Sequence, residues 1–179
     1  MIYFVTGNGG KFVEARAIID DLLQRNIGYT EVQADSLEEV AAFGIAEVMR
    51  KFASPAIIED AGLFIDHLRG FPGVYSAYVF DTIGNRGTLK LMADVENRRA
   101  VFRSVVCYGE PGMEPRFFRG EMEGRIGYAP RGEGGFGYDP IFEVEERTLG
   151  EMSLEEKNRI SHRARSMMAL KEWLDRGRP

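Results

Sequence analysis

Hydrophobic residues in the first sixty positions alternate between short β-favouring runs and longer stripes at helical spacing. Ile2–Val5 predicts a buried strand, and the apolar stripe in Phe12–Leu23 predicts a helix. Tyr29–Gln33 predicts a second strand, and Leu37–Phe52 predicts a second helix. A third apolar run starts at Ala56. The resulting order, β-α-β-α-β, is typical of an α/β sheet.

The second half of the chain predicts a helix followed by two long strands. Thr82–Ala93 carries apolar residues at helical spacing, and Arg99–Gly109 and Glu114–Ile126 have the composition of strands. Glycine and proline between these two strands predict an antiparallel hairpin. Ala129–Tyr138 has too many glycines for a stable element and predicts a loop, and Asp139–Phe142 predicts a short strand.

Two Ser-x-x-Glu sequences indicate where helices begin. Ser36 with Glu39, and Ser153 with Glu156, have the spacing of a capping box, in which each residue satisfies a free backbone N–H of the first turn. Ser161 is in a position to cap the last helix. We therefore expect a helix after each of these serines.

Composition limits the class of protein. The chain has 179 residues, of which 44% are hydrophobic and 28% charged, as in an ordinary globular protein. We expect a single domain over residues 1–179, with two lobes, the second formed mainly by the hairpin region, about residues 95–130. A net charge of −5 argues against a nucleic-acid partner. It does not exclude a small phosphorylated ligand in a local basic pocket.

Other features bear on location and metal content. No apolar run approaches the ~20 residues of a membrane span, and no basic leader precedes the first apolar run, so neither a membrane partner nor a signal peptide is expected. A single cysteine, Cys107, cannot form an intramolecular disulfide and fits a reducing cytoplasm. Cys107 with His67 and His162 offers no structural zinc cluster. Cys107 is expected to be inert core, and His67 a surface residue.

A glycine-rich turn, Thr6–Lys11 (TGNGGK), links the first strand to the first helix. Free N–H groups and the positive end of a helix dipole at such a turn can bind phosphate, and Lys11 adds a positive charge. The turn matches neither the Walker A loop nor G-x-G-x-x-G, because Phe12 follows the lysine. By itself it is also consistent with a plain tight connection.

Two adjacent carboxylates, Glu59 and Asp60, follow the third apolar run, and Gly62 then predicts a turn. Ligands of open α/β sheets bind at the carboxyl ends of strands. Neighbouring carboxylates repel one another, and a cation such as Mg²⁺ makes it easier to keep both ionised. Two solvated acids at a strand end are the alternative interpretation.

Further residues could complete a nucleotide site. Glu31, at another strand end, could bind Mg²⁺ together with Asp60, and Asp60 could activate a water. A mobile loop, Gly134–Tyr138, offers the rings of Phe136 and Tyr138 for base stacking. Lys157, His162 and Arg163 could donate hydrogen bonds to phosphate or to a base carbonyl. Considered alone, His162 and Arg163 would more often form a solvated helix face.

Five segments in order give the chain a resemblance to the inosine triphosphate pyrophosphatase family. The segments are TGNGGK (6–11), EDAG (59–62), GFPGVYSA (70–77), GFGYDPIF (135–142) and EKNRISHR (156–163). The resemblance covers almost the whole chain. It implies an α/β fold whose long mixed sheet is flanked by helices in two lobes around a central cleft. It also implies hydrolysis of inosine, deoxyinosine and xanthosine triphosphates to the monophosphate and pyrophosphate, Mg²⁺ dependence, and a homodimer.

The resemblance assigns roles to particular residues. Asp60 is implied as proton acceptor and metal ligand, Glu31 as the second metal carboxylate, and Glu59 and Lys11 as supporting catalytic residues. The implied substrate-binding residues are Thr6, Gly7, Asn8, Gly9, Gly10, Lys11, Ala61, Phe136, Gly137, Tyr138, Asp139, Lys157, His162 and Arg163. Lys157 is expected at the cleft, where it affects selectivity more than folding.

The chain departs from the family pattern at several positions. Ala61 stands where many relatives have Ser or Thr, and Ala77 and Tyr78 stand where many have Lys or Arg. One charge that would neutralise phosphate is therefore missing or comes from another residue. Aligning the region of Glu31 requires a gap, so Glu38 and Glu39 compete for the metal role.

Two other functions remain open at the level of sequence. One is a pyrophosphatase for other modified or pyrimidine nucleotides, as in Maf-like proteins. The other is a nucleotide-binding module without turnover, which the paired acids of EDAG argue against because binding alone needs no general base. Rates with a panel of triphosphates separate these alternatives.

Overall fold

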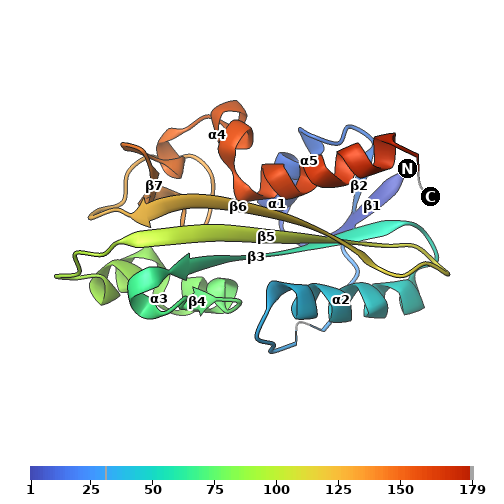
Figure 1. The fold of residues 1–179 in the computed structure, drawn as a ribbon, viewed down its shortest axis with the longest axis horizontal. Helices are drawn as coiled ribbons and strands as arrows, with labels where there is room; N and C mark the ends of the chain where they lie inside the picture. Colours follow the sequence, from blue (N-terminus) through green and yellow to red (C-terminus); the bar gives the residue numbers. More distant parts are fainter. Residues whose placement is uncertain (31, 178–179) are drawn as a thin grey trace. The chain divides into compact units, whose positions relative to one another are not determined.

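The computed structural model describes residues 1–30 and 32–177. Within them the chain is an α/β fold with an eight-stranded mixed sheet and five α-helices, as expected (Figure 1). The helices are α1 (Gly9–Arg16), α2 (Leu37–Lys51), α3 (Ser76–Leu91), α4 (Leu154–Ile160) and α5 (His162–Asp175). The strands are β1 (Ile2–Val5), β2 (Leu22–Arg25), β3 (Ala56–Ile65), β4 (Pro72–Gly73), β5 (Arg99–Gly109), β6 (Arg116–Ile126), β7 (Phe142–Val144) and β8 (Arg147–Thr148). Short 3₁₀ helices are η1 (Asp66–Leu68), η2 (Asp139–Ile141) and η3 (Leu149–Glu151).

The strand order is β2-β1-β3-β5-β6-β7-β8, with β4 pairing only with β3. β1 is parallel to both β2 and β3, whereas β4 on β3, β7 on β6 and β8 on β7 are antiparallel. β5 and β6 are neighbours joined by six residues, too few for a parallel crossover, so they form the expected hairpin. No helix in the described part of the chain has the length and hydrophobicity that crossing a bilayer requires.

The chain divides into two compact units. Unit 1 comprises Met1–Asp60, Ser104–Gly120 and His162–Pro179, and unit 2 comprises Ala61–Arg103 and Glu121–Ser161. The unit boundaries fall within β3, β5 and β6, so each of these strands contributes residues to both units.

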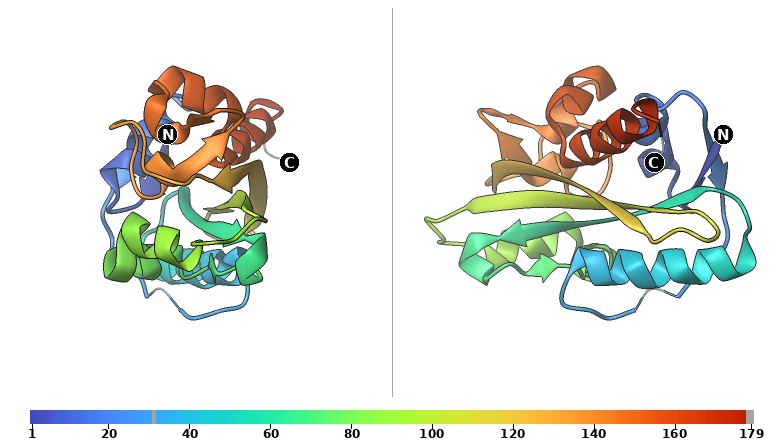
Figure 2. Two further views of the ribbon diagram at one scale, coloured as in Figure 1. Left: turned by 90° about the vertical axis from the view of Figure 1, so that its left-hand side faces the viewer. Right: turned by 45° about the vertical axis from the view of Figure 1, so that its right-hand side comes forward.

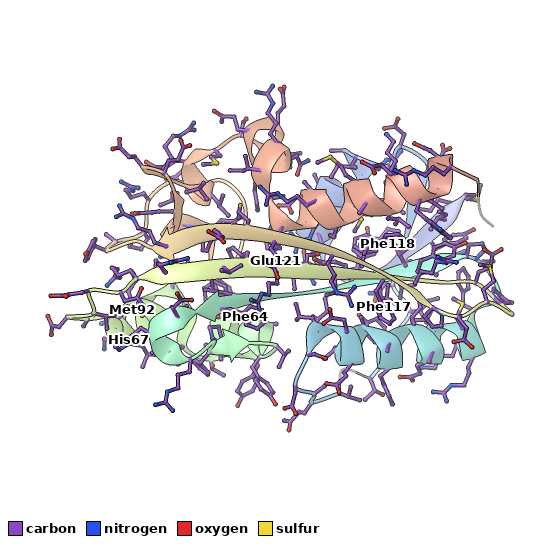
Figure 3. All side chains as sticks on the ribbon, in the orientation of Figure 1. Phe64, His67, Met92, Phe117, Phe118 and Glu121 are labelled. Atoms are coloured by element: carbon purple, nitrogen blue, oxygen red, sulfur yellow. The ribbon has the colours of Figure 1, made fainter. Side chains whose placement is uncertain are left out.

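Unit 1 is built around its part of the sheet, with α1 and α5 on one face and α2 on the other (Figures 1 and 2). Successive β6 side chains show the two faces: Phe118 points toward α5, where its ring lies 5.7 Å from that of Trp173, and Phe117 points the opposite way (Figure 3). α5 approaches β6 closely at Gly120, where a Cβ would lie 2.0 Å from the His162 carbonyl oxygen. The buried core on the α1/α5 face includes Ile2, Phe4, Ala15, Leu22, Ile57, Val106, Tyr108, Met167 and Leu170.

Unit 2 has its own hydrophobic core, formed by Leu63, Ile65, Met92, Ala100, Phe102, Met122, Ile126, Tyr138, Ile141, Phe142 and Leu149. The buried Arg98 closes one end of it, because its guanidinium donates to the carbonyl oxygens of Met92, Ile126 and Gly127. Phe64 lies outside this cluster, and its ring is covered by the Arg103 guanidinium at 4.6 Å (Figure 3).

The second strand differs from the prediction. It is formed by Leu22–Arg25, and the helix before it ends at Arg16. Leu22 is fully buried opposite Ile2, and a buried leucine suits either a helical stripe or a strand, so spacing alone could not distinguish them. The described residues of Tyr29–Gln33 belong to no helix or strand, and Glu31 lies outside the described part. The apolar ring of Tyr29 instead packs against α2 at Gly44.

Three other helices and strands have limits that differ from the predicted ones. β3 continues through Gly62 without a turn, because this glycine allows close approach of β4: a Cβ here would lie 2.3 Å from the Gly73 carbonyl oxygen. α3 starts at Ser76 and breaks at Gly84. The predicted strand Asp139–Phe142 is mostly the 3₁₀ helix η2, with β7 following it.

Several local predictions are confirmed. Ser36 with Glu39 and Ser153 with Glu156 both form capping boxes, at the starts of α2 and α4. β5 has the predicted limits. Cys107 is fully buried and His67 is exposed, as expected.

Candidate active site

A glycine-rich turn joins β1 to α1 in unit 1. Asn8 caps the helix, because its Oδ1 accepts the Lys11 backbone N–H at 3.0 Å, and Thr6 Oγ1 in turn accepts the Asn8 N–H at 3.1 Å. Gly9 and Gly10 begin α1, and N–H groups of a first turn have no partner within the helix. Gly9 is exposed. The turn can therefore bind phosphate oxygens with its N–H groups and the positive end of the helix dipole.

Lys11 reaches from this turn to a buried carboxylate on β3. Its Nζ lies 2.9 Å from Glu59 Oε2 and donates to the Glu59 backbone carbonyl oxygen at 3.2 Å. The Glu59 side chain is fully buried, whereas 20% of the Lys11 side chain is exposed. Lys11 thus links the turn to β3 and still presents its ammonium group at the surface.

The other oxygen of Glu59 is held from α5 and β5. Arg163 Nε lies 3.1 Å from Glu59 Oε1, and Arg163 Nη1 lies 2.5 Å from Glu14 Oε2. Ser104 Oγ donates to the same Glu59 oxygen at 2.8 Å. Two cations and two carboxylates therefore balance within this set (Lys11, Glu59, Arg163, Glu14 and Ser104), called the Glu59 network below.

Glu59 stays ionised because of its partners. Burial acts to raise the pKa of Glu59, but the charges of Arg163 and Lys11, with hydrogen bonds from Lys11 and Ser104, outweigh burial and lower the pKa to about 2 from 4.5. A carboxylate with so low a pKa is a weak base at neutral pH. Glu59 therefore suits holding Lys11 in place better than accepting a proton.

Asp60 occupies the opposite face of β3 from Glu59, because successive strand side chains point to opposite sides. Ile57, on the Glu59 face, belongs to the core beneath α1 and α5. Ile58, on the Asp60 face, lies against Gly44 of α2. Asp60 is half-buried. The two acids therefore do not form one solvated strand end: Glu59 is buried, whereas Asp60 is half-buried with its Oδ2 enclosed.

A magnesium site needs only one or two carboxylates when substrate phosphates and waters supply the other ligands. The half-buried Asp60 fits that donor set, while Glu31 lies outside the described residues. Of the two competitors for the metal role, Glu39 caps α2 and Glu38 pairs with Arg119 at 2.5 Å. No group of three or more His, Cys, Asp or Glu that could hold a metal occurs among the described residues.

In unit 2 a second candidate cluster surrounds the segment Phe136–Asp139. Asp139 Oδ2 accepts the Phe136 backbone N–H at 2.8 Å and the Lys157 ammonium at 2.5 Å. Both charged side chains are buried, and Lys157 Nζ lies 4.9 Å from the centroid of the half-buried Phe136 ring. A buried ion pair thus supports an aromatic ring on which a base can stack.

The loop that carries this ring, which was expected to be mobile, is hydrogen-bonded to η3 and α3. The Gly134 N–H donates to the Gly150 carbonyl oxygen at 2.9 Å, and Asn85 Nδ2 donates to the Gly137 carbonyl oxygen at 3.0 Å. The backbone at Gly135 and Gly137 has φ of +70° and +61°. These glycines supply a left-handed conformation in an ordered loop, and glycine count alone could not reveal this.

Tyr138 is a core residue and not a stacking surface. Only 5% of the residue is exposed, and its hydroxyl donates to the Ser76 carbonyl oxygen at 2.9 Å. Its ring packs edge-on against Phe80 at 5.3 Å. Burial, with the nearby charge of Asp81, raises the pKa of the Tyr138 hydroxyl.

All three C-terminal candidates are buried, so the alternative of a solvated helix face for His162 and Arg163 does not hold, and Lys157, expected at the cleft rather than in the core, is buried as well. Each keeps only 3% of its surface exposed. Arg163 joins Glu59 and Lys11 in unit 1, whereas Lys157 joins Phe136 and Asp139 in unit 2. Ala61, the first residue of unit 2, is half-buried.

Sequence reasoning missed Glu14, Ser104 and Asn85. Glu14 follows Lys11 by one helical turn and reads as an exposed acid, because its partner Arg163 is 149 residues away. Ser104 sits alone among apolar residues of β5, a pattern that signals a buried hydroxyl but not its acceptor. No sequence pattern pointed to Asn85.

Together, the mixed α/β sheet, the phosphate-type turn and the aromatic loop define a protein of the nucleotide-binding class. A model of the Ham1 family matches residues 2–173. The chain belongs to the Ham1 family, which confirms the family expected from the five motifs.

Known relatives cover the chain almost completely. The dITP/XTP pyrophosphatase of Methanopyrus kandleri is 52% identical over 178 residues, covering 96% of this chain and 95% of the relative. The dITP/XTP pyrophosphatase of Methanosarcina mazei is 49% identical over 176 residues, covering 96% of each chain. The solved structure of the Staphylococcus aureus Ham1 protein superposes with a TM-score of 0.85 at 30% identity, covering 97% of each chain.

Proposed function

We propose that the protein hydrolyses the non-standard purine nucleoside triphosphates dITP, ITP and XTP to the monophosphate and pyrophosphate. Close relatives carry the name dITP/XTP pyrophosphatase. The observation that carries the proposal for this chain is the position of Lys11, which belongs to a phosphate-type turn and contacts Glu59, the neighbour of Asp60 in β3. This arrangement supplies a cation for phosphate and a carboxylate for the attacking water.

In the proposed reaction the turn of unit 1 binds the triphosphate. The Lys11 ammonium donates to the Glu59 backbone carbonyl oxygen and pairs with Glu59 Oε2, and its partly exposed side chain is proposed to reach a phosphate oxygen as well. Asp60 takes a proton from the attacking water as its oxygen bonds to phosphorus. The bond between the α- and β-phosphates breaks, and pyrophosphate leaves with the electron pair. Arg163 acts by holding Glu59, since both Glu59 and Glu14 already accept its N–H groups.

Mg²⁺ is the proposed metal, with Asp60 as a carboxylate ligand and Glu31 as the second. When bound, it would neutralise phosphate charge and polarise the phosphoryl group. The half-buried Asp60 is preferred for this role because the fully buried Glu59 is already paired with two cations.

Base selectivity is proposed to reside in the loop of unit 2. Hypoxanthine and xanthine carry a carbonyl where adenine carries an amine, so a donor in the site pairs with the first two and opposes the third. Backbone N–H groups of the loop around Gly137 and the Lys157 ammonium are the proposed donors. Lys157 lies against the ring of Phe136, which would stack on the base. Guanine also has the carbonyl, so its exclusion must involve the 2-amino group.

A panel assay of pyrophosphate release tests this function. Purified protein with Mg²⁺ is given dITP, ITP, XTP, dATP, GTP and pyrimidine triphosphates, and release is expected with the first three. Fastest release with pyrimidine or other modified nucleotides would favour the Maf-like alternative. Binding without release would indicate a binding module. The same preparation, examined by light scattering, tests the proposed homodimer. We propose a cytoplasmic location, because the proposed substrates belong to the nucleotide pool.

A further inference from the structure

We propose that Asn85 is a positioning residue that sets base selectivity by holding the loop at Gly137; this rests on the function proposed above. Asn85 Nδ2 donates to the Gly137 carbonyl oxygen at 3.0 Å, across 52 positions of sequence. Both residues belong to unit 2.

The break in α3 serves this contact. Gly84 has φ of +60° and ψ of −167°, a conformation that is essentially confined to glycine, inside an otherwise helical segment. Asn85 follows directly, and its side chain therefore leaves the helix in a direction that an unbroken α3 would not give. Thr88 Oγ1 donates to the Gly84 carbonyl oxygen at 3.0 Å, so a side chain of the following turn contacts the backbone at the break.

Asn85 is one of several residues of α3 that contact the loop. The Tyr138 hydroxyl donates a hydrogen bond to the carbonyl oxygen of Ser76, at the start of α3. Asn85, in the middle of α3, donates a hydrogen bond to the carbonyl oxygen of Gly137. Between these attachments and Asp139, which accepts the Phe136 N–H, the loop has little freedom to change the position of the Phe136 ring. The Asn85 contact holds the backbone of Gly137, directly after Phe136, from α3.

The amide group is specifically required. The buried Asn85 Oδ1 has no hydrogen-bond partner, so the side chain works through its N–H alone. An aspartate of the same shape would place an oxygen against the Gly137 carbonyl oxygen. Two acceptors repel, except where the carboxyl is protonated and can donate.

The test compares Asn85→Asp with Asn97→Asp, which makes the same charge change in unit 2. Asn97 is exposed, and its Oδ1 accepts the Arg99 N–H, a role that aspartate keeps. For Asn85→Asp we expect faster hydrogen exchange in the peptide covering residues 134–139, a KM for dITP raised about tenfold, and reduced preference for dITP over dATP. We expect kcat and Tm to change little, and the KM defect to shrink as pH falls toward 5. Asn97→Asp should match the wild type throughout.

Unchanged loop exchange and unchanged KM in Asn85→Asp would overturn the proposal. The proposal would also be overturned if Asn85→Asp lowered both kcat and Tm but kept the preference for dITP over dATP, because that result indicates a structural role only. Hydrogen exchange needs no nucleotide. If the wild type released no pyrophosphate, the proposed function would fail. Hydrogen exchange of the loop in Asn85→Asp would still show whether Asn85 holds the loop: faster exchange supports this role, and unchanged exchange contradicts it.

Discussion

Lys11 Nζ lies 2.9 Å from Glu59 Oε2, so the cation nearest the glycine-rich turn is already paired with a buried carboxylate. Arg163 and Glu14 extend this pairing into a balanced set of charges. The Glu59 network therefore fixes Lys11 in position before any phosphate binds, and Asp60, on the other face of β3, is the carboxylate proposed to act on water. The division of roles between two adjacent acids follows from the alternation of a strand.

Asp60→Asn is expected to lower pyrophosphate release by about 10²–10⁴-fold, because an amide cannot accept the proton of the attacking water. Asp60 is half-buried, so Tm should change little. Initial rates with dITP and a thermal melt are the measurements. Asp20→Asn, at an exposed position of unit 1, is the control and should behave as the wild type. Near-normal rates in Asp60→Asn would remove it from the catalytic role.

Glu59→Gln is expected to reduce the free energy of unfolding by roughly 3–5 kcal/mol, because it leaves Lys11 without its buried countercharge and leaves two cations to share the single carboxylate of Glu14. Denaturant unfolding measures this change. Glu38→Gln is the matched control: the Glu38–Arg119 pair is exposed, and its loss should cost about 0–1 kcal/mol. Equal losses in the two variants would show that the Glu59 network adds no more stability than a surface pair.

Low pH is expected to reduce the free energy of unfolding through protonation of Glu59. The pKa of Glu59 is lowered from 4.5 to about 2 in the folded protein, so its contribution to stability is complete above pH 4.5 and is lost progressively as pH falls toward 2. Unfolding free energies at pH 7, 5, 4 and 3 measure the slope. Glu59→Gln should show a shallower slope below pH 4.5 than the wild type. Parallel curves for the two proteins would contradict this assignment.

Lys157→Ala is expected to affect both folding and selectivity. The change leaves the buried Asp139 carboxylate without its cation, at a cost of roughly 3–5 kcal/mol, and it removes a donor beside Phe136. The measurements are denaturant unfolding and the ratio of rates with dITP and dATP, with exposed Lys90→Ala as the control. Lost stability with an unchanged ratio would make Lys157 purely structural.

Chelation of divalent cations is expected to abolish pyrophosphate release, and added Mg²⁺ should restore it. Without nucleotide, EDTA should leave Tm unchanged, because the Glu59 network is balanced by its own cations. Full activity in EDTA would exclude the proposed metal role of Asp60.

Sequence patterns predicted the fold class because apolar spacing and turn residues act locally. The long strands and both capping boxes were found in this way. The second strand was misplaced because Leu22 is buried in either conformation, and pairing with β1 decides between them. Gly62 was interpreted as a turn, although it permits close approach of another backbone.

The sequence predicted which residues belong to the candidate site better than it predicted the burial and the partners of those residues. Motifs singled out Lys11, Glu59 and Asp60 but could not indicate that Glu59 is fully buried between two cations. The motifs indicated Arg163 as a substrate-binding residue but could not indicate its partners, which are more than a hundred positions distant in the chain. Such long-range pairings depend on tertiary structure, and a local pattern does not record them.

The most direct measurement is the rate of pyrophosphate release from dITP and from dATP by the wild-type protein, with Asp60→Asn as the background. The account predicts release from dITP that is faster by about 10²-fold or more, because a donor placed for a base carbonyl opposes the amine of adenine. Equal rates with the two nucleotides, or release that persists in Asp60→Asn, would contradict it.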